Sequence, residues 1–521
     1  MRSLLRLIAA LLLASLPLIP TVHAETPVAS PIVAEHPLSA AYDLDVTLDA
    51  ETRVISGSEE IAWTNTTGET QTELPLRLYP NGDYYDEAAL ELTNVTIDEV
   101  PVTPEIGGDA TLARLDLGRE VAPEETVTIA LTFATTVPVS SQGSFGIFQL
   151  DTERGVWSLS DWYPIVAGWE ASEDRWYDDT PTMFGDPTFS EAATYDVTLT
   201  APSALTIVGT GVDAIATSTT GELVTHEITT GPVRDFALSV LPTADSPLGE
   251  LVTDARTIDD VADDGSLDVH LSLLASQDIP GLRDAILDAV AQALPLYAEM
   301  MGTLPMADLD IATQSLNGAN GVSWSGLVWL DVDTIVSDGV LSDQEKLGLT
   351  FVVTHELGHQ WIGGMIGSNS NDHGFMTEGL TNALALDVLR QAEGSDAAIQ
   401  YMNAYVAGGY AALVRDGRDV IADEPLTNET NGVLRSLAIY GKGALGFEAI
   451  RQDLGERAFH EAMAAYAADF RFGIATPEDL LAKFMAVAGP LDDPAYLWDF
   501  WFHQDTATLQ DVEHIMASSG H

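Results

Sequence analysis

The spacing of apolar residues changes about halfway along this 521-residue chain. Between residue 41 and about residue 245, apolar and polar residues alternate, as they do at Val127, Ile129, Leu131 and Phe133. This period of two belongs to strands with one buried face and predicts an antiparallel β domain. From residue 280 onward, most apolar residues recur at helical spacing. The change in period therefore predicts an N-terminal β domain followed by a mixed α/β domain in which helices dominate.

The second half is expected to contain both helices and short strands. Helices are predicted over residues 280–301, 342–363, 377–393, 434–454, 456–470 and 477–487. Strands are predicted over residues 267–274, 309–313 and 326–330. The stretch from residue 242 to residue 265 is rich in Asp, Pro and Gly and has little periodicity, so we expect the domain boundary within it. The predicted domains are residues 25–262 and 263–521.

The first 24 residues have the pattern of a secretory signal peptide. Arg2 and Arg6 precede an apolar run over residues 4–18, and Val22-His23-Ala24 places small residues at a cleavage position. The alternative is an uncleaved membrane anchor, but two prolines interrupt the stretch, and no later segment has the ~18 continuous apolar residues of a membrane span. We therefore expect a cleaved leader, a secreted or periplasmic protein, and no stable membrane anchor.

The composition is strongly acidic, with 80 acidic residues against 21 Lys plus Arg and a formal net charge of −59. Because nucleic acids are bound largely through Lys and Arg, no nucleic acid partner is expected. The hydrophobic share of 46% is close to that of ordinary globular proteins, so the chain should fold. The absence of cysteine excludes disulfides and thiolate metal ligands. The acidic surplus suits either adaptation to high salt or a very soluble secreted protein.

The residues His355, Glu356 and His359 form the pattern H-E-x-x-H. Ser342 and Glu345 have the spacing of a capping box at the start of the same predicted helix. On a helix, the two histidines share one face and can reach a single ion at the ~2.0–2.1 Å that zinc prefers. If they were ordinary core residues, Glu356 between them would be a buried unpaired charge. The pattern therefore predicts a metal site.

A hydrolytic zinc site needs a third protein ligand and an open fourth position. Glu378 is the candidate, because it begins the predicted helix after the one that carries His355 and His359. The predicted site holds one Zn²⁺ through these three residues, with a water molecule in the fourth position. Zinc lowers the pKa of such a water towards ~7, and Glu356 takes its proton and later returns it to the leaving amine. A purely structural zinc is disfavoured, since structural sites usually have four protein ligands.

The segment His355-Glu356-Leu357-Gly358-His359-Gln360-Trp361, followed by Glu378, resembles the gluzincin metallopeptidases of the membrane alanyl aminopeptidase family. The family pattern is H-E-x-x-H, eighteen residues, then Glu. Further similar segments are Tyr-Gly-Lys-Gly-Ala at residues 440–444, Trp-Tyr-Pro at 162–164 and Leu-Arg-Leu-Tyr-Pro-Asn at 76–81. The resemblance implies a β domain seated on a thermolysin-like catalytic domain, in a short form without the long C-terminal helical domain of many relatives. It also implies that Tyr440 donates a hydrogen bond to the oxyanion of the tetrahedral intermediate.

The chain departs from the family pattern upstream of the metal motif. Aminopeptidases of the family carry G-x-M-E-N, whose Glu anchors the substrate's α-ammonium while its backbone lies along the peptide like an added strand. The matching residues Gly321, Val322 and Ser323 are candidate substrate-binding residues, with Ser323 where the Glu is expected. A hydroxyl does not replace a carboxylate opposite an ammonium, because the charge-assisted hydrogen bond is worth about 1.5–3 kcal/mol. Asp331, Asp333 or an acidic residue of the β domain are the candidate replacements.

The leading hypothesis is a secreted zinc metallopeptidase, of aminopeptidase type, that acts on oligopeptides. One variant is an endopeptidase of the same fold, which Ser323 favours because the amine anchor is missing. A hypothesis from another class is a weakly active protein that keeps the fold and binds peptides. The presence of Glu356 and Tyr440 argues against it, since a decayed enzyme loses such residues first. In each case a peptide is the expected partner.

Overall fold

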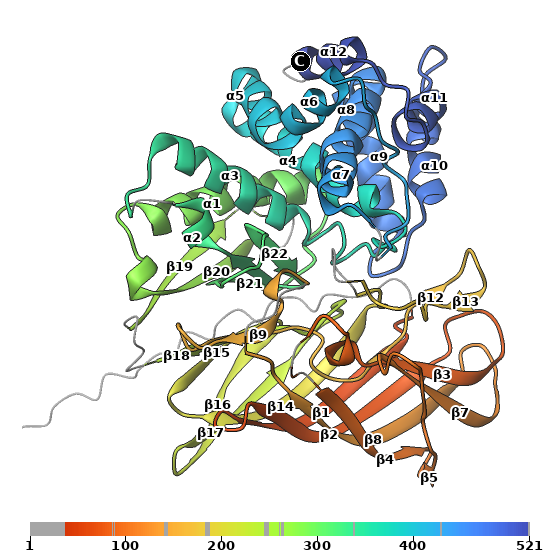
Figure 1. Cartoon of the computed structure of the whole chain (residues 1–521), viewed down its shortest axis with the longest axis vertical. Helices are drawn as coiled ribbons and strands as arrows, with labels where there is room; N and C mark the ends of the chain where they lie inside the picture. The colour runs from red at the N-terminus through yellow and green to blue at the C-terminus, as the bar shows by residue number, and fades with distance from the viewer. Residues whose placement is uncertain are drawn as a thin grey trace, which may run out of the picture. The chain divides into compact units, whose positions relative to one another are not determined.

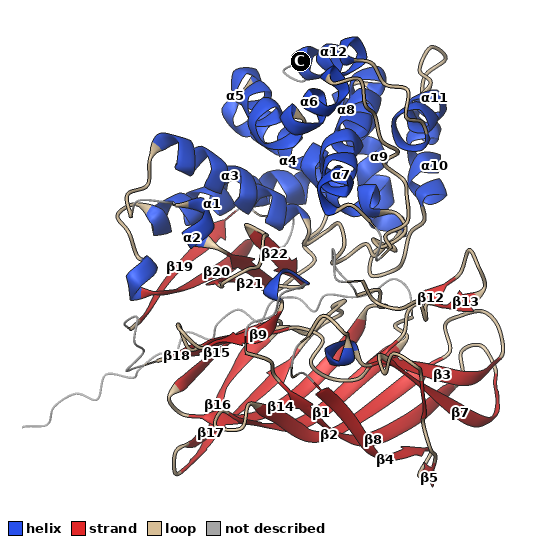
Figure 2. Ribbon diagram, viewed as in Figure 1, coloured by secondary structure: helices blue, strands red, loops and turns tan. Residues whose placement is uncertain are grey.

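A computed structural model describes residues 37–85, 87, 89–139, 144–182, 188–243, 250–259, 261, 265–336, 339–427 and 430–518. The predicted signal peptide over residues 1–24 lies outside the described residues. Within them, no helix combines the length and apolar character needed to cross a membrane. Figures 1 and 2 show that strands make up the first half of the described chain and that helices dominate the second, as the change in period predicts.

Among the described residues, the first half contains four β-sheets. Its largest sheet has eight strands in the order β16-β17-β14-β1-β2-β8-β4-β5, and the others follow the orders β15-β18-β10-β9, β11-β3-β7-β6 and β12-β13. The strands are β1 (Ala40–Asp49), β2 (Val54–Thr64), β3 (Gln71–Arg77), β4 (Ala89–Ile97), β5 (Val100–Pro101), β6 (Glu105–Ile106), β7 (Leu112–Val121), β8 (Thr126–Thr136), β9 (Phe148–Asp151), β10 (Val156–Leu159), β11 (Ile165–Val166), β12 (Trp169–Glu170), β13 (Arg175–Trp176), β14 (Ala193–Pro202), β15 (Leu205–Gly209), β16 (Val212–Thr220), β17 (Leu223–Thr229) and β18 (Leu238–Pro242).

The alternation of residues in β8 matches its environment in the large sheet. Val127, Ile129, Leu131 and Phe133 are buried in the core of the β half, and the residues between them lie on the opposite face. Because successive side chains of a strand point to opposite faces, one slip in register would exchange the two sets. The hydrophobic pattern therefore fixes the register of this strand in its sheet.

The second half contains one five-stranded sheet and a set of helices. The sheet order is β19-β20-β21-β23-β22, and Figure 1 shows α1 and α3 over one of its faces. The strands are β19 (Leu251–Asp259), β20 (Ser266–Leu274), β21 (Asp308–Thr313), β22 (Gly321–Trp324) and β23 (Leu327–Leu330). The helices are α1 (Leu282–Met301), α2 (Val332–Ile335), α3 (Asp343–Gly358), α4 (Leu380–Glu393), α5 (Ser395–Tyr401), α6 (Gly408–Arg415), α7 (Gly432–Ser436), α8 (Gly443–Leu454), α9 (Glu456–Asp469), α10 (Pro477–Val487), α11 (Pro494–Trp498) and α12 (Leu509–Ser518), with π-helical turns η5 (Phe375–Gly379), η6 (Met402–Val406), η7 (Leu437–Lys442) and η8 (Asp499–His503).

The predicted boundary between residues 262 and 263 falls inside the hairpin of β19 and β20. These strands pair antiparallel from Leu251 opposite Leu274 to Asp259 opposite Ser266. The sequence does not reveal β19, because this edge strand buries one side chain, Ile258. We therefore propose that the domain boundary lies between the end of β18 and the start of β19, before the predicted position.

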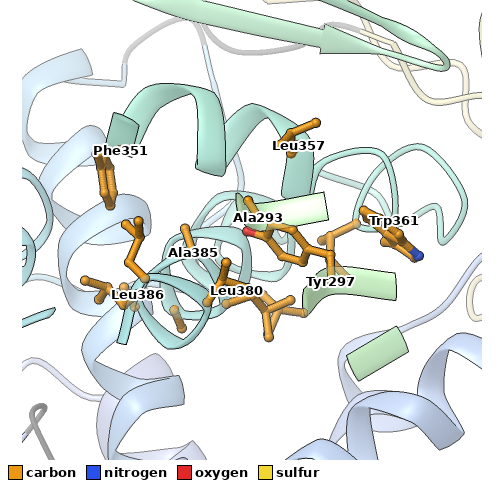
Figure 3. Packing of buried hydrophobic residues seen from close by; sticks show 14 of the residues in the cluster. Ala293, Tyr297, Phe351, Leu357, Trp361, Leu380, Ala385 and Leu386 are labelled. Atoms are coloured by element: carbon orange, nitrogen blue, oxygen red, sulfur yellow. The ribbon is translucent and has the colours of Figure 1, made fainter. Parts of the chain in front are cut away.

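The core of the second half packs α1, α3 and α4 against one another. Figure 3 shows Tyr297 of α1 close to Trp361, with Leu380 and Leu357 nearby. The rings of Tyr297 and Trp361 stack with centroids 5.4 Å apart. Helix α3 ends at Gly358, short of the predicted end at residue 363, because the chain turns back at Gly363, whose φ is 100°. This turn places Trp361 in the core rather than on a continued helix.

Candidate metal centre

Helix α3 carries His355 in its last turn and ends at Gly358, next to His359. A capping box fixes where the helix begins. The Ser342 hydroxyl accepts a hydrogen bond from the Glu345 backbone N–H at 3.3 Å, and the Ser342 N–H donates to the Glu345 carboxylate at 2.9 Å. This is the capping box that the sequence predicts. At the other end His359 is the C-cap residue, and its ring centroid lies 4.6 Å from that of His355. The two imidazoles therefore converge on one side of the last turn.

Two glycines allow the neighbouring helices to approach this turn closely. A Cβ on Gly358 would lie 2.8 Å from the hydroxyl of Tyr297 in α1. A Cβ on Gly379, at the end of η5, would lie 2.8 Å from the carbonyl oxygen of Ile439 in η7. Since packed interiors tolerate no such overlap, a larger residue at either position would move the helices apart. Glu378, the residue before Gly379, is thereby held next to the last turn of α3.

The ligand atoms of His355, His359 and Glu378 form a compact triangle. The two Nε2 atoms are 3.0 Å apart, and Glu378 Oε2 lies 3.2 Å and 3.3 Å from them. In a tetrahedral zinc site with bonds of ~2.0–2.1 Å, neighbouring ligand atoms are about 3.3 Å apart. Glu378 Oε2 is buried and lacks a well-aligned hydrogen bond in the described part of the chain, as expected of an oxygen that needs a cation. These three residues fit one zinc ion and could hold it.

The surroundings of this triangle favour a positive charge. His359 Nδ1 lies 3.0 Å from the Ile362 carbonyl oxygen, which only accepts, so in the neutral ring Nε2 keeps its lone pair for a metal. Burial disfavours the charged form of His359, but the carboxylate of Glu378 outweighs burial and raises its pKa to about 9. Burial also disfavours the Glu378 carboxylate, yet the two imidazoles outweigh it and hold the pKa well below its usual range. A proton or a divalent cation can supply this charge.

Glu356 is buried beside the two histidines and against the start of β22. A Cβ on Gly321 would lie 2.6 Å from Glu356 Oε1, so the carboxyl group occupies the space that a larger side chain would fill. Burial raises the pKa of Glu356, and the neighbouring His355 and His359 partly oppose that effect. A carboxyl group with a raised pKa beside a metal site can both accept and return a proton.

Tyr440 lies on η7, with its ring centroid 6.2 Å from that of His355. Burial and the Glu378 carboxylate raise the pKa of Tyr440 well above its usual value, so its hydroxyl remains a hydrogen-bond donor. Two residues later, the fully buried Lys442 donates to both carboxylate oxygens of Asp419 at 3.1 Å and 3.0 Å. This buried ion pair ties the turn that carries Tyr440 to a separate loop.

The predicted substrate-binding residues lie on β22, which is the edge strand opposite β19 in the five-stranded sheet. β22 pairs antiparallel with β23, and the Asp331 N–H donates to the Asn320 carbonyl at 2.9 Å. Because hydrogen-bonded and non-hydrogen-bonded pairs alternate in such a ladder, Val322 directs its backbone groups toward β23. Gly321 and Ser323 direct theirs away from it. These two residues can therefore bind an extended peptide as an added strand.

The side chain of Ser323 is held by Gln360, the residue after His359. Gln360 Nε2 donates to Ser323 Oγ at 2.7 Å and to the Trp324 carbonyl at 2.9 Å. Gln360 Oε1 accepts from the Gly326 N–H at 2.8 Å. The position where a carboxylate is expected therefore carries a neutral hydroxyl that is linked to the end of the metal-binding helix.

The two acidic residues that the sequence suggests as replacement anchors have other partners. Asp331 accepts hydrogen bonds from the Leu316 N–H at 2.9 Å and the Thr334 N–H at 3.1 Å. Asp333 forms an ion pair with Arg154 at 2.6 Å. Since both carboxylates are already engaged, the structure does not support either as a substitute for the missing Glu.

Sequence reasoning missed three side chains that organise this site, namely Gln360, Arg234 and Asp235. Asp235 accepts a hydrogen bond from the Ser325 N–H at 2.9 Å, at the tip of the β22–β23 hairpin. A signal was present in the sequence, since Arg234 and Asp235 interrupt the apolar run of residues 232–238. Charged residues within such a run are rarely buried without partners.

The fold is similar to that of a known two-domain peptidase. The crystal structure of the M1 zinc metallopeptidase from Deinococcus radiodurans matches with a TM-score of 0.62 and 17% identity, over 92% of this chain and 93% of that chain. A variant of that enzyme bound to a Tyr-Ser-Ala substrate matches with a TM-score of 0.60 and 17% identity, over 88% of this chain and 96% of that chain. The expected β domain followed by a mainly helical domain is confirmed by this similarity.

Sequence comparison finds aminopeptidases among the similar proteins. Aminopeptidase M1-B of Oryza sativa subsp. japonica is 25% identical over 41% of this chain and 25% of its own length. Endoplasmic reticulum aminopeptidase 2 of Bos taurus is 22% identical over 51% of this chain and 28% of its own length. The chain thus matches about a quarter of the length of these curated relatives. A model of the peptidase family M1 domain matches residues 287–516, the segment that contains His355, His359 and Glu378.

Proposed function

We propose that this chain is a zinc-dependent peptidase of aminopeptidase type that acts on oligopeptides and is exported by its N-terminal leader. The observation that carries the proposal is the convergence of His355, His359 and Glu378, whose ligand atoms lie 3.0–3.3 Å apart, beside the buried Glu356. The aminopeptidases among the curated relatives support the type of activity. Export rests on the sequence pattern of residues 1–24 alone.

The residues of the site divide the chemistry of peptide hydrolysis among them. His355, His359 and Glu378 would hold the zinc ion, which would polarise the scissile carbonyl and acidify water. Glu356 serves as the general base that takes a proton from the attacking water and returns it to the leaving amine. Tyr440 donates a hydrogen bond to the oxygen that becomes negatively charged. The backbone of Gly321 and Ser323 aligns the peptide as an added strand.

A panel of three substrates tests this proposal on the purified mature protein. Aminoacyl chromogenic substrates report cleavage next to a free amine, matched N-acetylated peptides report cleavage without that amine, and an internally quenched oligopeptide reports internal cleavage. We expect turnover that a chelator abolishes and that added zinc restores. If turnover persists after the metal has been removed and its absence verified, the proposed zinc chemistry is wrong.

The contact between Ser323 and Gln360 favours a second candidate, an endopeptidase of the same fold. Ser323 offers a neutral hydroxyl that already accepts a hydrogen bond from Gln360 at 2.7 Å. Such a group gives an α-ammonium no opposite charge, so a free N-terminus gains little from it. Equal cleavage of the acetylated and free peptides would favour the endopeptidase. Zinc-dependent peptide binding without cleavage of any substrate would instead indicate a peptide-binding protein.

A further inference from the structure

The tip of the β22–β23 hairpin is held by side chains from two distant parts of the chain. From the second half, Gln360 accepts from the Gly326 N–H at 2.8 Å. From the first half, Asp235 accepts from the Ser325 N–H at 2.9 Å, and the Arg234 N–H donates to the Ser325 hydroxyl at 3.1 Å. The hairpin that carries the peptide-binding edge is therefore fixed from both sides of its turn.

The guanidinium group of Arg234 reaches the turn that follows the metal-binding helix. Arg234 is 8% exposed. Its guanidinium group donates hydrogen bonds to four backbone carbonyls, those of Ser190 at 2.7 Å, Gly364 at 3.0 Å, Met365 at 3.3 Å and Gly473 at 2.8 Å. Three of these carbonyls belong to the second half of the chain. Adjacent residues of the first half thus contact both the hairpin and the turn after α3.

The close fit around Arg234 indicates that this contact is specific. A Cβ on Gly367 would lie 2.4 Å from Arg234 Cζ, so only glycine leaves room for the guanidinium group there. An apolar cluster beside it, with Ala237, Leu241, Trp324 and Trp329 among its members, excludes water from the same region. Since buried charges add little net stability, the buried Arg234 and its neighbour Asp235 are better explained by the geometry that their hydrogen bonds fix.

We propose that Arg234 and Asp235 are positioning residues for peptide binding. They hold the β22–β23 hairpin at a fixed separation from the turn after α3, so that the backbone groups of Gly321 and Ser323 face a peptide at the metal centre. This inference rests on the proposed peptidase function and extends it, because it gives the β half of the chain a part in substrate alignment. Neither residue contacts the reacting atoms in this account.

Asp235→Ala tests the inference, because it removes the acceptor of the Ser325 N–H. We expect the KM for a peptide substrate to rise about 5- to 20-fold while kcat changes less than about 3-fold. The reason is that the strand binds the peptide equally well in the ground state and in the transition state. We also expect faster amide hydrogen exchange at Val322 and Gly326, with unchanged zinc content, because the Val322 N–H faces β23 and the Gly326 N–H donates to Gln360. Asp235→Asn keeps an acceptor oxygen and should restore most of the affinity.

Two further variants keep the test decisive. Ser325→Ala removes the partner of the Arg234 N–H with a smaller change of structure, and it should also raise KM. This variant therefore tests the inference even if Asp235→Ala fails to fold. Thr476→Ala is the matched control, because it removes a hydroxyl that caps α10 and should lower the melting temperature without changing KM.

The outcomes separate this inference from the proposed function. If KM and hydrogen exchange stay within about 2-fold of the unsubstituted protein in both Asp235→Ala and Ser325→Ala, the positioning role is overturned. If the unsubstituted protein cleaves no peptide, the proposed function is contradicted. In that case hydrogen exchange alone decides whether Asp235 holds the hairpin, with faster exchange supporting the role and unchanged exchange overturning it.

Discussion

A single substitution at Glu356 can distinguish zinc binding from catalysis of peptide hydrolysis. Glu356→Gln keeps the size of the side chain but removes the group that accepts a proton. We expect kcat to fall by about 10²- to 10⁴-fold while zinc content is retained, because a general base contributes that factor. Peptide kinetics together with metal analysis measure both effects. Loss of zinc along with activity would assign Glu356 a ligand role instead.

The protonation of His359 predicts how zinc binding depends on pH. Without a metal, Glu378 raises the pKa of His359 to about 9, so at neutral pH the site holds a proton that a metal must displace. We expect zinc binding at pH 7.5 to release about one proton, and affinity to fall as the pH is lowered. Calorimetry of the metal-free protein in buffers of different ionisation enthalpy measures this number. An observed enthalpy that is the same in every buffer would contradict the prediction.

Glu59 on β2 lowers the stability of the β half. Its side chain is buried, and neither carboxylate oxygen has a hydrogen-bond partner among the described residues, so burial raises its pKa well above the usual value. The folded state therefore binds a proton more tightly than the unfolded chain, and this group's contribution to stability is lost as pH rises above about 4.3. We expect Glu59→Leu to raise the free energy of unfolding at pH 8 by about 1–3 kcal/mol.

Denaturant unfolding at pH 5 and pH 8 tests the Glu59 prediction. The gain from Glu59→Leu should be larger at pH 8, where ionisation of the buried carboxyl costs the wild-type chain the most. A gain that is equal at both pH values would show that the benefit comes from apolar packing rather than from removing an ionisable group.

At the scale of elements, the site depends on how closely η5 and η7 approach each other. Gly379→Ala would place a Cβ 2.8 Å from the Ile439 carbonyl and move the helix that follows Glu378. We expect a loss of about 1–3 kcal/mol in unfolding free energy and a larger loss in kcat/KM, since a shift of about 1 Å can cost 10²-fold. Gly108→Ala, where a Cβ meets open space, is the control. Equal effects of the two substitutions would contradict the prediction.

Elements with a strong period or a clear apolar run could be predicted from the sequence, and weakly patterned ones could not. Residues 477–487 form α10 at the predicted bounds, because a Thr476 cap and a Pro at the first turn mark its start. β19 was missed since an edge strand buries few side chains, and β22 was missed because Gly321, Val322 and Ser323 are only partly buried and form no apolar run. The equally short β23 was predicted because its four residues are all apolar and buried. The proposed peptide-binding edge is therefore an element that local pattern does not reveal.

At the scale of the whole molecule, the formal charge of −59 predicts a stability that depends on salt. Repulsion among surface carboxylates opposes the folded state, and salt screens it over a Debye length of ~10 Å at 0.1 M and ~3 Å at 1 M. We expect the melting temperature to rise as NaCl increases over this range. Thermal melts across an NaCl series measure it. An unchanged or lower midpoint would count against adaptation to high salt and favour a merely soluble surface.

The sequence by itself determined the donor set of the proposed metal centre and the class of the fold. The spacing of His355, Glu356 and His359 on one helix is a local property, and so is the alternation that builds the β half, because each depends on residues only a few positions apart. The proposed third ligand, Glu378, was also visible as the acidic residue at the start of the next predicted helix.

Only the tertiary structure decided which groups surround that chemistry. Gln360 meets Ser323 and Asp235 meets Ser325 across 37 and 90 positions of the chain, which no periodicity records. The tertiary structure also showed that Asp331 accepts a hydrogen bond from the Leu316 N–H and that Asp333 forms an ion pair with Arg154. Neither residue therefore replaces the missing amine anchor. Specificity depends on such long-range contacts, because packing of the whole chain sets them and local spacing does not.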